Sequence, residues 1–283
     1  MQRSDPGLHT LTLMAEFLHD GIRFHYRDEG DGLPFFFQHG LGADLTQPFS
    51  LCRPLAGLRL IAFDARAHGK TSPAGPEEKI SLTTFADDLR ALMDHLAIRE
   101  AVVGGISMGA AITLNFALRH PDRVLGLVQS RPAWLDAPNP WNVTLFSLVT
   151  DLVRRFGRVA GKQRFLETPE YAETLAKWPD VANSLAGQFD NPVVDETAFK
   201  FERIIRDVPC HHRIDWMKIR VPTLILANRF DPIHPYEYAV EMQRLIPNAE
   251  FQEITAKSVS VEQHNADVQQ ALDGFLRRRF LER

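Results

Sequence analysis

Short runs of apolar residues alternate along the chain with longer stretches in which apolar residues recur every three or four positions. Runs with the length and composition of buried strands span residues 11–17, 22–26, 34–38, 58–63, 101–104, 124–128, 221–227 and 250–254. Helical spacing is found over residues 81–96, 110–120, 236–245 and 261–280. Because strands and helices take turns, the pattern predicts an α/β fold, with a mostly parallel sheet wrapped by helices on both faces.

The alternation stops after Ser130 and resumes near Val221. The residues between, from Arg131 to about Asp215, contain no run of strand type but several helical pieces separated by turns with proline and glycine. Many of their apolar side chains are bulky and aromatic, which is typical of a packed unit rather than a linker. We therefore expect a helical cap, residues 131–215, inserted after the sixth strand into a core formed by residues 1–130 and 216–283.

Composition and charge narrow the class of protein. Of the 283 residues, 45% are hydrophobic and 24% are charged, as in a globular domain, and the net charge of −4 does not indicate nucleic acid or a membrane as partner. The two cysteines form no disulfide framework, and the first residues lack the apolar core of a signal peptide. No run approaches the roughly 18 apolar residues of a membrane span. These features predict a cytoplasmic protein.

One short motif carries a chemical signal. Gly105-Ile106-Ser107-Met108-Gly109 follows a run of strand type and precedes a segment of helical composition that ends at Pro121. A serine at such a junction is held in a strained backbone conformation with its hydroxyl exposed, and the flanking glycines let strand and helix pass close together. The motif alone is common by chance, so its weight comes from this context.

With three further motifs in the same order, the chain resembles the α/β-hydrolase family. These motifs are His39-Gly40-Leu41-Gly42 after the third strand, the polar loop from Asp64 to Ser72 after the fourth, and Asp231 after the first strand beyond the insertion. The resemblance covers nearly all of the chain. It implies the α/β-hydrolase fold, with an eight-stranded, mostly parallel sheet and a cap, and hydrolysis without a cofactor or a metal ion.

The resemblance also assigns roles to particular residues. Ser107 is expected to be the nucleophile and Asp231 the acid of a catalytic triad. The backbone N–H groups of Leu41 and Met108 are expected to form the oxyanion hole. Trp134, near the end of the sixth strand, is expected to line the substrate pocket.

The base departs most from the family pattern. The family places a Gly-His pair shortly after the last strand, whereas the only histidine of that segment is His264, much further on. A capping-box pattern just before it puts His264 in the first turn of the final helix. We expect His264 to be the base, within hydrogen-bond reach of Ser107 and Asp231. His234, three residues after Asp231, is the alternative base and otherwise a residue of the pocket.

These assignments predict a serine hydrolase that cleaves an ester or a lactone of a small to medium apolar substrate through an acyl-enzyme. Hydrolysis of a carbon–carbon bond would use the same residues. A ligand-binding protein with little turnover on the same scaffold is the alternative of another class. Dehalogenase and epoxide-hydrolase chemistry is disfavoured, because those relatives have aspartate where Ser107 stands. A small molecule is the expected partner, and a homodimer is left open.

Overall fold

The computed structural model of the protein describes residues 12–282. Its sheet has eight strands in the order β1-β2-β4-β3-β5-β6-β7-β8. The β1–β2 and β2–β4 pairs are antiparallel and all other pairs are parallel. The strands are β1 (Thr12–His19), β2 (Ile22–Gly30), β3 (Leu33–Gln38), β4 (Leu58–Phe63), β5 (Ala101–Ile106), β6 (Val124–Ser130), β7 (Thr223–Ala227) and β8 (Ala249–Glu253). The predicted fold class is therefore confirmed, while the expected lead-in and Leu11 lie outside the described residues.

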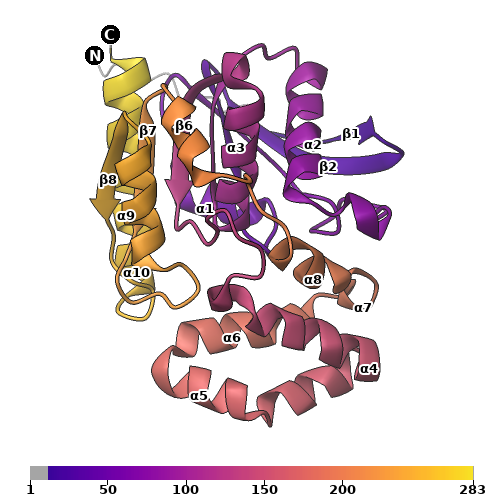
Figure 1. The fold of residues 1–283 in the computed structure, drawn as a ribbon. Coiled ribbons are helices and arrows are strands. Elements are labelled where there is room, and N and C mark those ends of the chain that lie inside the picture. Colours follow the sequence, from indigo (N-terminus) through magenta and orange to yellow (C-terminus); the bar gives the residue numbers. More distant parts are fainter. Residues whose placement is uncertain (1–11, 283) are drawn as a thin grey trace, which may run out of the picture.

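Helices cover both faces of this sheet (Figure 1). One face carries α2 (Leu82–His95), α3 (Met108–Arg119) and α9 (Tyr236–Leu245), and the other carries α1 (Thr46–Leu51) and α10 (Val261–Leu276). The central strands β3, β4 and β5 are buried on both sides, which explains why their sequences are apolar without alternation. Each large apolar side chain buried in these two layers contributes roughly 1.5–3 kcal/mol.

The segment between β6 and β7, residues 131–222, contains helices and no strand, as the sequence predicts. We call this segment the helical insertion; its longest helices group at one end of the sheet (Figure 1). Gly157 has φ +71° and bends α4. The helices are α4 (Leu145–Leu166), α5 (Pro169–Lys177), α6 (Pro179–Gly187), α7 (Val194–Thr197) and α8 (Phe199–Ile205).

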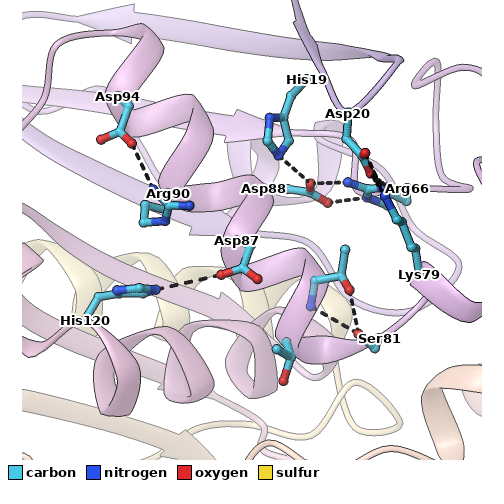
Figure 2. A network of polar contacts seen from close by, with 12 residues as sticks. His19, Asp20, Arg66, Lys79, Ser81, Asp87, Asp88, Arg90, Asp94 and His120 are labelled. Atoms are coloured by element: carbon cyan, nitrogen blue, oxygen red, sulfur yellow. Dashed lines mark hydrogen bonds and ion pairs between the residues drawn. The ribbon is translucent and has the colours of Figure 1, made fainter.

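A buried arginine ties the first turn of the sheet to α2. Arg66, only 1% exposed, donates two hydrogen bonds of 2.7 Å to the carboxylate of Asp88 and one of 2.8 Å to Asp20 (Figure 2). Lys79 also donates to Asp20 (Figure 2). Ser81 caps α2 by accepting from the N–H of Thr84. Because a buried charge is costly without a partner, this network fixes the polar loop after β4 in one position.

The junction between β5 and α3 is the closest backbone crossing near the sheet's carboxyl edge. A Cβ on Gly109 would lie 2.6 Å from the carbonyl carbon of Gln38 and 2.8 Å from the oxygen of His39. A Cβ on Gly105 would meet the backbone of Gly109 just as closely. Real Cβ atoms do not approach backbone this closely, so only glycine lets β3, β5 and α3 meet here.

Gly109→Ala should therefore destabilise the protein by about 1–3 kcal/mol, the usual cost of forcing extra atoms into a packed site. Urea unfolding measures this loss. Gly187→Ala is the matched control, because Gly187 has a helical φ of −63° and no atom lies within 4 Å of the added Cβ. The control should be neutral or slightly stabilised. Equal stabilities of the two variants would contradict the crossing described here.

Candidate active site

Ser107 occupies the turn between β5 and α3 in a backbone conformation that few residues adopt. Its φ is +56° and its ψ is −112°, and its side chain forms no capping hydrogen bond to the helix that follows. Positive φ at a residue other than glycine costs energy and is concentrated at functional sites. The structure thus shows the strained strand–turn–helix junction that the sequence predicts, and Ser107 lines an open cavity.

That cavity, of about 150 Å³, lies between the carboxyl edge of the sheet and the helical insertion. Trp134 and His234 both line it, as expected. The insertion supplies further wall residues, among them Val143, Phe146, Asp180, Val181, Ser184 and Leu185. A serine hydroxyl in such a site faces a mixed surface, because the insertion and the sheet's edge each supply both apolar and polar wall residues.

The loop after β3 is held rigidly beside Ser107. Leu41 lines the cavity, and Gly42 has φ +76°. The Nδ1–H of His39 donates to the Gly40 oxygen at 2.8 Å, and its Nε2 accepts from the N–H of Ala65 at 3.1 Å. This imidazole therefore braces the loop against the one after β4. In the described chain, no turn, loop or cap hydrogen bond uses the N–H of Leu41 or of Met108.

Asp231 lies just beyond β7 at the same edge. One carboxylate oxygen accepts from the N–H groups of Ile233 and His234 at 3.1 and 3.2 Å, and the other accepts from Nδ1 of His234 at 2.8 Å. Nη1 of Arg131 lies 3.5 Å from that second oxygen. Burial alone would raise the pKa of this carboxyl, but His234 and Arg131 outweigh it and hold the pKa well below its usual range.

His234 is the imidazole that this carboxylate orients. Its Nδ1–H points at Asp231, and its Nε2 has no hydrogen-bond partner among the described residues. Burial lowers its pKa and the Asp231 charge only partly opposes this, so the ring is neutral near pH 7. A neutral imidazole with a fixed Nδ1–H presents an unshared lone pair at Nε2, which is what a general base needs.

His264 does not make the contacts expected of it. Its Nδ1 donates to the backbone oxygen of Thr255 at 2.7 Å, and its Nε2 has no partner among the described residues. The structure shows a hydrogen bond neither to Ser107 nor to Asp231, and His264 is fully buried outside the cavity wall. The Asp231 carboxylate is instead hydrogen-bonded to the imidazole of His234 from its own turn. The capping prediction is correct, since Ser260 caps α10.

Two cationic residues of the cavity escaped the sequence reasoning. Arg131 directly follows β6, and Lys257 lies between β8 and α10; both line the cavity. The sequence does contain a signal for Arg131. It directly follows a predicted strand, and ligand sites of parallel sheets lie at the carboxyl ends of the strands, which is also the argument for Asp231. No motif in the segment between β8 and α10 marks Lys257 as a residue of the cavity. Within residues 12–282, no cluster of three or more His, Cys, Asp or Glu could hold a metal ion.

Burial lowers the pKa of His264 from 6.5 to about 4, with the Arg131 charge as the second cause. The unfolded chain therefore binds more protons between these two values, and stability should fall as pH drops from about 6.5 toward 4. His264→Asn keeps a donor for the Thr255 oxygen but cannot titrate. Urea unfolding at pH 7 and pH 5 should show a smaller loss in the variant than in wild type. An unchanged pH dependence would contradict this assignment.

Comparison with known proteins places the chain in a family. The chain is 28% identical over 243 residues to AB hydrolase superfamily protein YisY of Bacillus subtilis (strain 168), covering 81% of this chain and 86% of that protein. It is 29% identical over 252 residues to 2-hydroxymuconate semialdehyde hydrolase of Pseudomonas putida, covering 83% and 84%. The solved structure of a thermophilic esterase from Thermogutta terrifontis superposes with a TM-score of 0.69 at 24% identity, covering 95% and 98%. The sequence model of the alpha/beta hydrolase fold matches residues 34–264. The protein belongs to the α/β-hydrolase fold family.

Proposed function

We propose that this protein is a serine hydrolase that cleaves an ester or a lactone of a small substrate through an acyl-enzyme. One observation carries the proposal: the strained Ser107 and the hydrogen-bonded Asp231–His234 pair line the same cavity. A nucleophile, an oriented imidazole and a buried carboxylate are the three parts that acyl transfer by serine requires. We propose further that the helical insertion acts as the cap over the substrate.

In the proposed reaction, the Ser107 hydroxyl attacks the acyl carbon while Nε2 of His234 takes its proton. Asp231 holds the imidazole and stabilises its cation. The backbone N–H groups of Leu41 and Met108 receive the negative charge that develops on the carbonyl oxygen. The imidazolium then protonates the leaving group, and water attacks the acyl-enzyme by the same route. His264 is the alternative base.

Two other functions remain alternatives. Hydrolysis of a carbon–carbon bond would use the same nucleophile, and the 29% identity to 2-hydroxymuconate semialdehyde hydrolase supports it. A ligand-binding protein with little turnover is the other, since no imidazole is hydrogen-bonded to Ser107 in the described chain. Turnover of simple esters would exclude the ligand-binding alternative, and a diketone assayed beside the esters separates the carbon–carbon alternative from the first choice.

Ser107→Ala should lower kcat on a chromogenic short-chain ester by at least about 10⁴-fold, because no other group of the site can form the acyl-enzyme. The control is Ser147→Ala, a serine of α4 outside the cavity, which should keep its activity. Steady-state kinetics and circular dichroism on both variants measure turnover and folding. Retained turnover in folded Ser107→Ala would exclude Ser107 as the nucleophile.

His234→Ala and His264→Ala identify the base when both are assayed on one ester. Loss of the base typically costs about 10²–10⁴-fold, so His234→Ala should lose that factor in kcat. His264→Ala should lose much less, because its imidazole bonds only to the backbone oxygen of Thr255. The opposite result would assign the base to His264 and reject the assignment made here.

A further inference from the structure

Two positively charged side chains, Arg131 and Lys257, line the cavity, and few of their hydrogen-bond donors are used within the described residues. Arg131 is 7% exposed, and its Nε is buried with no hydrogen-bond partner among the described residues. Its one ion pair, Nη1 to Asp231, is long at 3.5 Å. Most N–H donors of this guanidinium have no acceptor in the described chain. Because unsatisfied buried donors cost free energy, an anion that accepted from them would be bound favourably.

Lys257 is the second cation. It lines the same cavity and forms no hydrogen bond or ion pair within residues 12–282. The positive charge of Arg131 is the main cause that lowers the pKa of Lys257, to about 8, and burial is the second. The two cations therefore repel one another across the cavity. An anion placed between them would replace this repulsion with two attractions.

The carboxylates of the cavity balance these two charges only in part. Asp231 lies 3.5 Å from Arg131, but it already accepts three hydrogen bonds from its own turn. Asp180 reaches the cavity from α6, but it forms no ion pair with Lys257 or Arg131, and its Oδ1 has no partner in the described chain. A ligand's anion would supply the ion-pair partner that Lys257 lacks among the described residues.

The position of Arg131 relative to Ser107 sets the size of that ligand. Strands β5 and β6 are paired with Ile106 opposite Ser130, and the N–H of Ser107 donates to the Ser130 oxygen at 3.0 Å. Neighbouring strands lie about 5 Å apart, so the chain leaves the sheet at Ser107 and at Arg131 side by side. A ligand that reaches both residues needs only a few carbons between its reacting carbonyl and its charge.

We propose that Arg131 and Lys257 bind a carboxylate carried by the acyl part of the substrate, so that the enzyme prefers half-esters of short dicarboxylic acids, or lactones that bear a carboxylate. The planar guanidinium fits a carboxylate with two parallel hydrogen bonds, and the lysine adds a point charge. This inference rests on the proposed function for the reaction at Ser107. The anion site itself can be tested without turnover.

Selectivity is measured with two 4-nitrophenyl esters of equal acyl length, the monoester of glutaric acid and the ester of pentanoic acid. Wild type should favour the glutarate ester in kcat/KM by about tenfold or more, the discrimination that one charge-assisted hydrogen bond supplies. Lys257→Met should lose most of this ratio, and Lys257→Arg should keep it. No preference in wild type, or an unchanged ratio in Lys257→Met, would overturn the proposal. Lys257 is substituted rather than Arg131, because Arg131 also contacts Asp231 and its loss would disturb the proposed triad.

Binding is measured by isothermal titration of Ser107→Ala protein with glutarate and with its neutral diamide, glutaramide. Glutarate should bind, glutaramide should not, and adding Lys257→Met should weaken glutarate about tenfold. Glutarate binding without turnover of any ester by wild type would support the anion site and reject the hydrolase assignment. Ester turnover without a preference for the glutarate ester and without glutarate binding would support the hydrolase assignment and reject the anion site. If wild type turns over no ester and the variant binds no glutarate, both proposals are overturned.

Discussion

The close crossing of β5 and α3 is the constraint on which the rest of the site depends. Without side chains at Gly105 and Gly109, the helix can start directly at the end of the strand and hold Ser107 at φ +56°. The strain is maintained by the packed sheet around the turn, because β5 is buried between its neighbours on both sides. The hydroxyl is thus presented by a turn that is anchored in the packed centre of the sheet.

The charges around Ser107 set the protonation states of the neighbouring side chains. Asp231 sits in a buried position where an isolated carboxylate would be unstable, and His234 and two backbone N–H groups stabilise its charge. The same interactions fix the tautomer of His234. Burial is the main cause that lowers the pKa values of His234 and His264, and the charges of Arg131 and Lys257 lower them further. The same two charges would favour an anionic ligand. One set of charges thereby supports both the reaction and the proposed preference for a carboxylate.

Much of the fold could be predicted because its signals are local: apolar runs for the strands, Ser81 and Ser260 as caps, and glycines where backbones meet. The position of Ser107 follows from the same local signals. The choice between His234 and His264 could not be predicted, because it depends on the path of the turn after β7. Its N–H groups and the His234 ring all converge on Asp231. The number of residues between Asp231 and each histidine does not determine which imidazole is hydrogen-bonded to its carboxylate.

The most direct test of the account is covalent labelling with a fluorophosphonate ester, followed by mass spectrometry of the peptides. This reagent reacts with a serine hydroxyl that a neighbouring base activates and that lies beside an oxyanion hole. The account predicts one label per chain, on Ser107, and much slower labelling in His234→Ala than in wild type. A label on another residue, or no label on the folded wild-type protein, would contradict the assignment of Ser107 as an activated nucleophile.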